Sequence, residues 1–304
     1  MNTNFLIKIA LLLIPVVGIG QVKSIEYFPE SVSTEHQIFF LGETHGIHSN
    51  FIHSMTMVEE LKSKNDFKFI LAEMSFSAGL LLNNSIQQKD TVALKKVLIG
   101  FGETFYRTDE KYRFYKNIIR LNEKYETKIE VLGVDIPASA RHFCDSVLKT
   151  SKDTFVVEYV QNNLKQAERA FKASDSDWDK TRDPMIFENF KKLQKHYNLN
   201  AHKAIGFWGT SHINKSKSEG VEWFASNLVK DGVKVYSIAQ YYINSSVMKP
   251  WFWVKNEPEG KCFYFQDDYS NIRGKSKKTL LEKPLELIFI PNLLLSDLKT
   301  KKLF

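Results

Sequence analysis

The feature of this sequence that most constrains its fold is an alternation of short apolar runs with longer amphipathic segments. The short runs end in glycine or polar residues and fall at 37–41, 67–72, 129–133, 204–208, 233–239 and 287–290. Each is typical of a buried β-strand. Strands that alternate with helices form a mainly parallel sheet. We therefore predict an α/β fold with a mainly parallel central sheet flanked by helices.

The segments between these runs have the periodicity of helices, at about 49–64, 77–88, 91–99, 110–125 and 138–149. Between 154 and 197 two helical patterns follow one another without a strand, which predicts a helical hairpin insertion at about 151–198. We expect its second helix to begin with Asp183 as cap and Pro184 in the first helical position. Its expected buried stripe is Met185, Ile186, Phe190, Leu193 and Tyr197.

The N-terminus has the pattern of a secretory signal peptide at 1–20. Lys8 precedes a short apolar run at 9–17, and Gly18 and Gly20 suit cleavage before Gln21. We expect an exported protein, periplasmic or secreted, whose mature part at 21–304 is a single α/β domain. No later run reaches the roughly 18 apolar residues of a membrane helix, so we expect no stable membrane insertion.

The charge pattern and the cysteine content limit the classes of partner that the chain is expected to bind. The net charge is +7, but lysines alternate with acidic residues along the expected helices. This pattern is typical of a solvated surface and does not favour nucleic-acid binding. The two cysteines, Cys144 and Cys262, could form a disulfide in an exported protein or remain buried thiols. The expected partner is a small-molecule or peptide substrate, and the sequence predicts no oligomeric state.

The end of the first strand carries a carboxylate and an imidazole, because residues 42–46 read Gly-Glu-Thr-His-Gly. Alternation along an extended chain points Glu43 and His45 the same way. Ligands of open α/β sheets bind beyond the carboxyl ends of the strands. This pair is therefore a candidate site, although Glu43 could instead cap a helix and His45 could bind a loop carbonyl.

Three further strands end in polar residues. Residues 209–212 read Gly-Thr-Ser-His, which places His212 as His45 is placed, and two other strands end at Glu73 and Asp135. A carboxylate beside an imidazole suits general base catalysis or metal binding. Asp135 could instead cap the helix that follows it.

Arg182 is a further candidate, since it would lie just before a helix start, where the helix dipole disfavours a cation. We expect it to bind Glu43 or Glu73, or to stabilise the oxyanion of a tetrahedral intermediate. The sequence contains no P-loop, no dinucleotide fingerprint and no nucleophile elbow.

These motifs together resemble the superfamily of erythromycin esterases, ChaN-type haem-uptake proteins and Tiki-type proteases. The resemblance covers about 36–236, and Thr44 alone separates Glu43 from His45, as in the ChaN and Tiki types. The matching positions are Gly42, Glu43, His45, Gly46, Glu73, Gly133, Asp135, Arg182, Asp183, Met185, Asn189 and His212. Pro137 replaces a glutamine common after the Gly-x-Asp strand of the esterases.

The resemblance implies hydrolysis of an ester or similar acyl bond. His45 would activate water, and Glu73 or Glu43 would orient the imidazole of His45. Arg182 with His212 would bind the oxyanion. In a metal-dependent variant Glu43, His45 and His212 would hold a divalent ion. A haem or small-ligand binding protein and a Tiki-type metallopeptidase remain open as alternatives.

Overall fold

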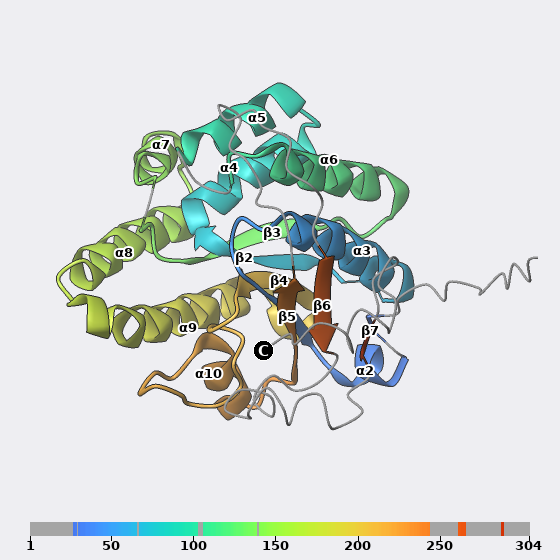
Figure 1. Ribbon diagram of the computed structural model, residues 1–304. Helices are drawn as coiled ribbons and strands as arrows, with labels where there is room; N and C mark the ends of the chain where they lie inside the picture. The colour runs from blue at the N-terminus through green and yellow to red at the C-terminus, as the bar shows by residue number, and fades with distance from the viewer. Residues whose placement is uncertain are drawn as a thin grey trace, which may run out of the picture.

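The computed structural model describes residues 27–243, except 29, 66, 103–105 and 139, and the backbone of short strands at 261–265 and 287–288. The side chains at 48, 49 and 241–243 are also outside the description. The expected signal peptide at 1–20 and its cleavage site at Gln21 lie outside the described residues. Figure 1 shows helices packed around a central twisted sheet.

The sheet has the order β3-β2-β4-β1-β5-β6-β7. Its first five strands are parallel, and β6 and β7 are antiparallel to their neighbours. The bounds are β1 Ile38–Glu43, β2 Phe69–Ser75, β3 Glu130–Asp135, β4 Ala204–Gly209, β5 Val235–Ile243, β6 Lys261–Phe265 and β7 Leu287–Ile288. Every residue of β1 is buried, as expected for a strand covered by helices on both faces.

Helices connect the parallel strands. They are α2 Glu30–Glu35, α3 His48–Lys64, α4 Phe76–Gln87, α5 Thr91–Gly100, α6 Asp109–Lys124, α7 His142–Thr150, α8 Thr154–Ala170, α9 Trp178–Tyr197 and α10 Phe224–Lys230. Figure 1 shows α3 and α6 on one side of the sheet and α9 and α10 on the other. The predicted α/β fold with a mainly parallel sheet is therefore confirmed.

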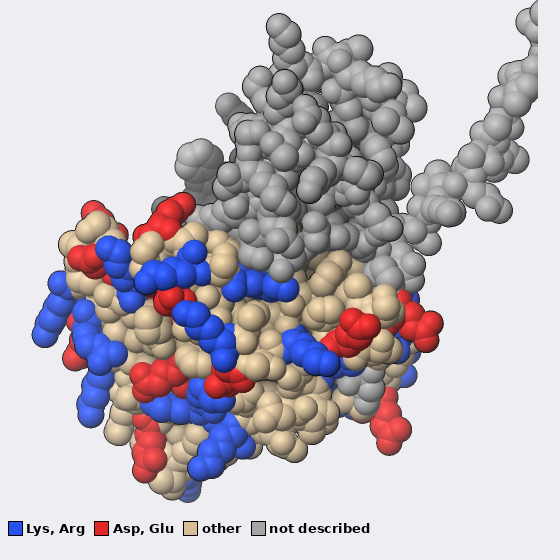
Figure 2. Space-filling model, turned by 90° about the horizontal axis from the view of Figure 1, so that it is seen from below, with Lys and Arg blue, Asp and Glu red and all other residues tan. Residues whose placement is uncertain are grey.

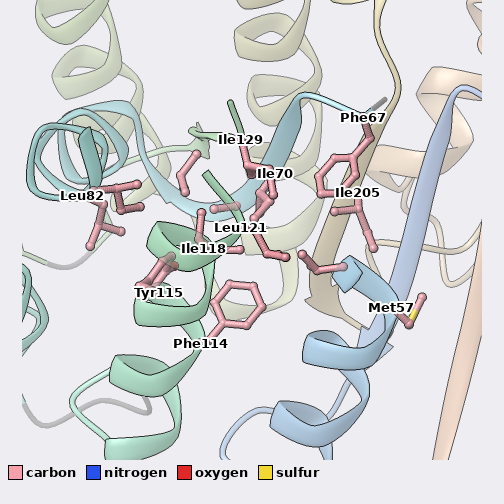
Figure 3. Close-up of a cluster of buried hydrophobic side chains, with 14 of the residues drawn as sticks. Met57, Phe67, Ile70, Leu82, Phe114, Tyr115, Ile118, Leu121, Ile129 and Ile205 are labelled. Carbon is pink, nitrogen blue, oxygen red and sulfur yellow. The ribbon is translucent and has the colours of Figure 1, made fainter. Parts of the chain in front are cut away.

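A separate apolar core lies on each face of the sheet. Figure 3 shows part of the first, in which Phe114 and Ile118 of α6 and Met57 of α3 pack with Ile70 and Ile205 of the strands. The second core includes side chains of α8, α9 and α10, among them Val160, Ile186, Phe190 and Phe224. Full burial of one aliphatic or aromatic side chain contributes about 1.5–3 kcal/mol, so the two cores hold the helices firmly on the sheet.

The predicted strand positions are close to the observed ones, with instructive differences. β2 continues to Ser75, so Glu73 lies within the strand rather than after its end. The segment after residue 244 is expected to contain strands and loops without a predicted strand position before 287, and β6 forms within it at Lys261–Phe265. The short helices α2 and α10 were also not predicted.

The helical hairpin is present as α8 and α9, but the predicted start of its second helix is wrong. α9 begins at Trp178, and Pro184 lies inside it. Trp178 packs against Phe171 at a ring-centroid distance of 5.4 Å, which anchors the extra first turn. Asp183 uses its carboxylate for tertiary hydrogen bonds instead of a cap. Tertiary contacts therefore outweigh the local preference of proline for a helix start.

The helix expected at 138–149 begins four residues late, at His142. Ala140 has a positive φ of 57°, a left-handed conformation that a right-handed helix does not include. Asp135 therefore does not cap this helix, and its carboxylate Oδ1 accepts instead from the backbone N–H of Ile136 at 2.7 Å.

The outer edge of β3 is closed by α4. Asn83 accepts from the N–H of Val131 and donates to its carbonyl, both at 2.7 Å, so its amide takes the place of a neighbouring strand. The close approach of α4 requires glycine at 79, because a Cβ there would lie 2.6 Å from the backbone nitrogen of Gly133.

Surface and thiol features add less. On the face shown in Figure 2, basic and acidic side chains are interspersed. Among the described residues no helix is long and apolar enough to cross a membrane. Cys144 is a buried free thiol on α7, and the side chain of Cys262, in β6, lies outside the described residues.

Candidate functional site

The five sequence-predicted candidates meet at the carboxyl edge of the parallel sheet. Glu43 ends β1, Glu73 lies near the end of β2, and His212 follows β4. Because the strands are parallel and in register, with Glu43 opposite Gly209, their ends bring these side chains to one edge. Arg182 reaches the same place from α9.

His45 bridges two buried carboxylates. Its Nδ1 lies 3.2 Å from Glu43 Oε1, and its Nε2 lies 3.4 Å from Glu73 Oε2. The imidazole itself is 35% exposed, whereas both carboxylates are buried. The expectation that Glu43 and His45 point the same way is therefore met. Lys111 of α6 approaches Glu43 Oε1 from another side, at 3.9 Å.

Arg182 is the centre of the second half of the site. Its Nε donates to Asp135 Oδ1 at 3.0 Å, and Nη2 donates to Asp135 Oδ2 and, at 2.8 Å, to Glu73 Oε1. Its Nη1 lies 3.1 Å from His212 Nε2. Arg182 lies inside α9 and not before it, so the dipole argument for a partner fails. The expected carboxylate partner, Glu73, is nevertheless present.

His212 is held from both sides of its ring. Nδ1 lies 3.0 Å from Asp183 Oδ1, which also accepts from the backbone N–H of Phe224 at 2.7 Å. With Nδ1–H donated to Asp183, Nε2 accepts from Arg182 when the ring is neutral. When the ring is protonated, Nε2–H faces Glu73 Oε1 at 3.5 Å. His212 is buried, and its contacts with Arg182 and Glu73 help to hold those two side chains in position.

The electrostatics of His45 follow from its carboxylate partners. Burial lowers the pKa of His45, but hydrogen bonds to Glu43 and Glu73 outweigh burial and raise it to about 9. Burial raises the pKa of Glu43, yet Lys111 and His45 outweigh it, so this pKa lies below its usual value. Both partners of the His45–Glu43 contact are therefore charged at neutral pH.

The remaining groups obey the same balance. Burial raises the pKa of Glu73, but His212, His45 and Arg182 outweigh burial and hold this pKa well below its usual range. Burial lowers the pKa of His212, and Asp183 and Glu73 more than compensate, so this pKa is raised. The site is thus a buried charge network in which Glu43, Glu73 and Asp135 each face a cation, while Arg182 opposes protonation of His212.

Gly209 allows three of these side chains to converge. A Cβ at this position would lie 3.3 Å from His45 Nε2, 3.4 Å from His212 Cδ2 and 3.8 Å from Glu73 Oε2. The backbone N–H of Gly209 also donates to Glu73 Oε2 at 2.8 Å. A Cβ at residue 209 would therefore make one tight contact, with His45 Nε2, and ordinary contacts with the other two side chains.

A cleft of about 280 Å³ opens onto the network. Its lining combines charged and apolar side chains: His45, Glu73, Met74, Ser75, Phe101, Tyr106, Asp135, Ile136, Ala138 and Arg182. A larger cleft of about 540 Å³ lies elsewhere, by the start of β3, and is lined by residues of the opposite strand end such as Glu130. The smaller cleft is the one that contains the reactive groups.

Sequence reasoning missed Lys111 and Tyr106 as site residues and assigned Asp183 to a cap. The Tyr106 hydroxyl donates to the backbone carbonyl of Glu73 at 2.7 Å, and Lys111 lies 5.7 Å from the centre of the Tyr106 ring. Tyr106 belongs to the connection from α5 to α6 and Lys111 to the first turn of α6, where no strand end marks them. The signals for the tertiary role of Asp183 were its adjacency to Arg182 and its place in the Arg-Asp element of the superfamily resemblance.

The metal-binding alternative is not favoured by the geometry. No group of three or more His, Cys, Asp or Glu side chains in the described part of the chain is arranged to hold a metal ion. Of the three candidate ligands, His212 has both ring nitrogens facing other side chains, Asp183 and Arg182. A metal-ligating nitrogen must offer its lone pair, so His212 would first have to leave Arg182.

Comparison with known proteins supports the fold. No model of a known protein family matches the sequence, and no curated protein matches it significantly. A protein from Bacillus cereus has a TM-score of 0.52 and 16% identity, covering 83% of this chain and 80% of that one. A mutant of the erythromycin esterase EreC in its open conformation has a TM-score of 0.52 and 12% identity, covering 79% and 89%.

The haem-binding ChaN of Campylobacter jejuni is also among the structural neighbours, at a TM-score of 0.42 and 13% identity over 67% of this chain and 80% of that one. That score is too low to support an argument. The resemblance that the motifs suggested is therefore confirmed as a likeness of fold to the erythromycin esterase, with ChaN a more distant neighbour.

Proposed function

We propose that this site is the active centre of a hydrolase that cleaves an ester or similar acyl bond, with His45 as the proton-transfer group. One observation carries the proposal: the partly exposed imidazole of His45 lies in a cleft between two buried carboxylates. A titratable group placed in a cleft, with a pKa strongly shifted by specific partners, is characteristic of catalytic sites.

In the proposed reaction the neutral His45 ring removes a proton from water, and the resulting nucleophile attacks the acyl carbon. Glu43 holds Nδ1–H at 3.2 Å, and Nε2, which faces Glu73 Oε2 at 3.4 Å, is the nitrogen that takes the proton from water. The protonated ring then returns the proton to the departing alcohol. The carboxylates stabilise the imidazolium form that exists between these two steps.

Arg182 is the proposed oxyanion donor. When His212 is neutral, the contacts of Arg182 to Asp135, Glu73 and His212 occupy four of the five N–H groups of a guanidinium, and one N–H on Nη1 remains. Arg182 lines the cleft, and this remaining N–H is the proposed donor to the carbonyl oxygen. His212, which the sequence suggested as a second oxyanion donor, instead fixes the orientation of Arg182 in this proposal.

The raised pKa of His45 makes the mechanism testable. With a pKa of about 9, roughly one ring in a hundred is neutral at pH 7. A base of this kind gives a kcat/KM that rises with pH and levels off above about pH 9. If His45 served instead as a general acid, kcat/KM would fall over the same interval.

The experiment is a kcat/KM profile with neutral aryl esters between pH 6 and 11. His45→Gln is expected to lose activity by about 10²–10⁴-fold, the usual loss for a general base, together with the limb near pH 9. His36→Gln is the matched control, because His36 precedes β1 at the opposite end of the strand. Esterolysis with an unchanged limb in His45→Gln contradicts the assignment.

The same preparation tests the alternatives. A Soret absorbance band in the purified protein favours haem binding, and chelator-sensitive cleavage of a peptide library favours a metallopeptidase.

We further propose export with cleavage before Gln21, supported by the apolar run and the small residues that precede it. Mass spectrometry of the secreted chain should give an N-terminus at Gln21. Recovery of the protein only as an uncleaved chain that begins with Met1 contradicts export.

A further inference from the structure

One wall of the cleft is aromatic and is fixed to the reactive groups. Tyr106 stacks on Phe101 with ring centroids 4.5 Å apart and an interplanar angle of 25°. The Tyr106 hydroxyl donates to the backbone carbonyl of Glu73, the residue whose carboxylate contacts both His45 and Arg182. The position of the ring is therefore set relative to the proposed base and oxyanion donor.

The other apolar part of the lining lies on the strands. Met74 of β2 and Ile136, directly after β3, line the same cleft as Tyr106. Both are almost completely buried, so they fix the shape of the cleft and expose little surface of their own. A ligand ring is therefore held mainly by the Tyr106 ring, and aromatic pairs add about 0.5–1.5 kcal/mol in offset or edge contacts.

The charged groups of the cleft do not favour an ionised ligand. Arg182 faces Asp135 and Glu73, and His45 faces Glu43 and Glu73, so both cations already have carboxylate partners. A ligand carboxylate or phosphate would have to displace one of these buried partners, which then remains without a cation. A ligand cation would meet carboxylates that are already neutralised.

We propose that the cleft selects esters in which the group beside the scissile carbonyl is uncharged and aromatic, and that Tyr106 is the residue that determines this preference. The proposal rests on the proposed hydrolase function for its turnover assay. The cleft volume of about 280 Å³ is at the low end of small-ligand pockets, so it accommodates a single ring and not a large polycyclic acid.

The test compares three esters with one leaving group: 4-nitrophenyl benzoate, acetate and hydrogen succinate. Because intrinsic reactivities differ, the quantity compared is the ratio of kcat/KM values in each variant to that in the parent protein. Tyr106→Ala should lower kcat/KM for the benzoate about tenfold more than for the acetate. Tyr106→Phe keeps the ring, removes the hydroxyl contact to Glu73 and should retain most of the preference.

An equal loss for benzoate and acetate in Tyr106→Ala overturns the specificity role, as does a loss for the hydrogen succinate ester as large as that for the benzoate. Circular dichroism and thermal unfolding show whether Tyr106→Ala folds. If it does not, Tyr106→Leu, which keeps apolar volume without a ring, replaces it and should show the same selective loss.

Binding without turnover separates this inference from the proposed function. Acetophenone, an uncharged ketone of similar shape to a benzoate ester, should bind the parent protein more tightly than benzoate anion in titrations followed by NMR. The same titration with Tyr106→Ala should show weaker binding of acetophenone. Selective acetophenone binding in a protein that cleaves no ester supports the cleft preference and refutes the hydrolase function. Esterolysis without selective acetophenone binding supports the hydrolase function and refutes the cleft preference.

Discussion

Replacement of Arg182 by lysine tests whether the buried network depends on a planar guanidinium or only on a positive charge. The Arg182 side chain is 13% exposed and contacts Asp135, Glu73 and His212 through three different nitrogens. A lysine ammonium is a single point with a shorter reach across the site, so it cannot meet both carboxylates in the same geometry.

The magnitude follows from the hydrogen bonds that a lysine cannot make. Arg182→Lys keeps the charge but removes at least two charge-assisted hydrogen bonds, each of which contributes about 1.5 kcal/mol or more. We therefore expect the free energy of unfolding to fall by about 3 kcal/mol. Arg182→Met leaves the carboxylates of Asp135 and Glu73 buried without their cation and should cost about 3–5 kcal/mol.

The assay is urea unfolding followed by circular dichroism at pH 7, with Arg120→Lys as the matched control. Arg120 also pairs with a carboxylate, Glu59, at 2.7 Å, but its side chain is 69% exposed. An exposed pair contributes only about 0–1 kcal/mol, so the control should change little. If Arg182→Lys and Arg120→Lys lose the same small amount, the account of Arg182 as the centre of the buried network is refuted.

Three further outcomes are expected from the geometry of the site and of the β3 edge. The folded-state pKa of His45, about 9, exceeds its unfolded value of 6.5, so its contribution to stability is complete below pH 6.5 and is lost as pH rises through 9. Thermal unfolding across this interval should show that loss, and His45→Gln should remove it. Gly209→Ala should reduce esterolysis severalfold while leaving helix content unchanged by circular dichroism, because its Cβ would lie 3.3 Å from His45 Nε2 and shift the imidazole by a few tenths of an ångström; full activity contradicts this close approach. Asn83→Ala should cost about 1–3 kcal/mol in urea unfolding because two backbone groups of Val131 lose their partner, and the exposed Asn84→Ala is the control with no loss.

The parallel strands could be predicted because β1 to β4 are short, mostly buried apolar runs, and such runs do not depend on distant partners for recognition. The start of α9 could not be predicted, since the local signal from Asp183 and Pro184 competes with tertiary contacts that the sequence does not display. The aromatic anchor of Trp178 on Phe171 and the bond from Asp183 to His212 decide the outcome.

Convergence of the strand-end residues could also be predicted, because parallel strands end at one edge and His45, Glu73 and His212 belong to such ends. The roles within the site depend on which atoms touch. Nothing in the sequence shows that His212 is enclosed by Asp183 and Arg182, or that Lys111 reaches Glu43 from α6. Side chains that reach the site from helices cannot be predicted from the positions of strand ends, and only the tertiary structure shows their contacts.

The cost of this network is itself an argument for function. Buried ion pairs of this kind are often no more stable than well-packed apolar side chains of similar size, because each ion must first lose its water. The chain nevertheless places Arg182 and Asp183 immediately before a proline inside α9, where local helix preference is already unfavourable. Local rules are broken most often where function requires it. A costly charge network and an interior proline occur in the same helical turn, and that turn faces the cleft containing His45. Stability alone accounts for neither feature, whereas a site that must hold a proton-transfer group and a fixed guanidinium accounts for both.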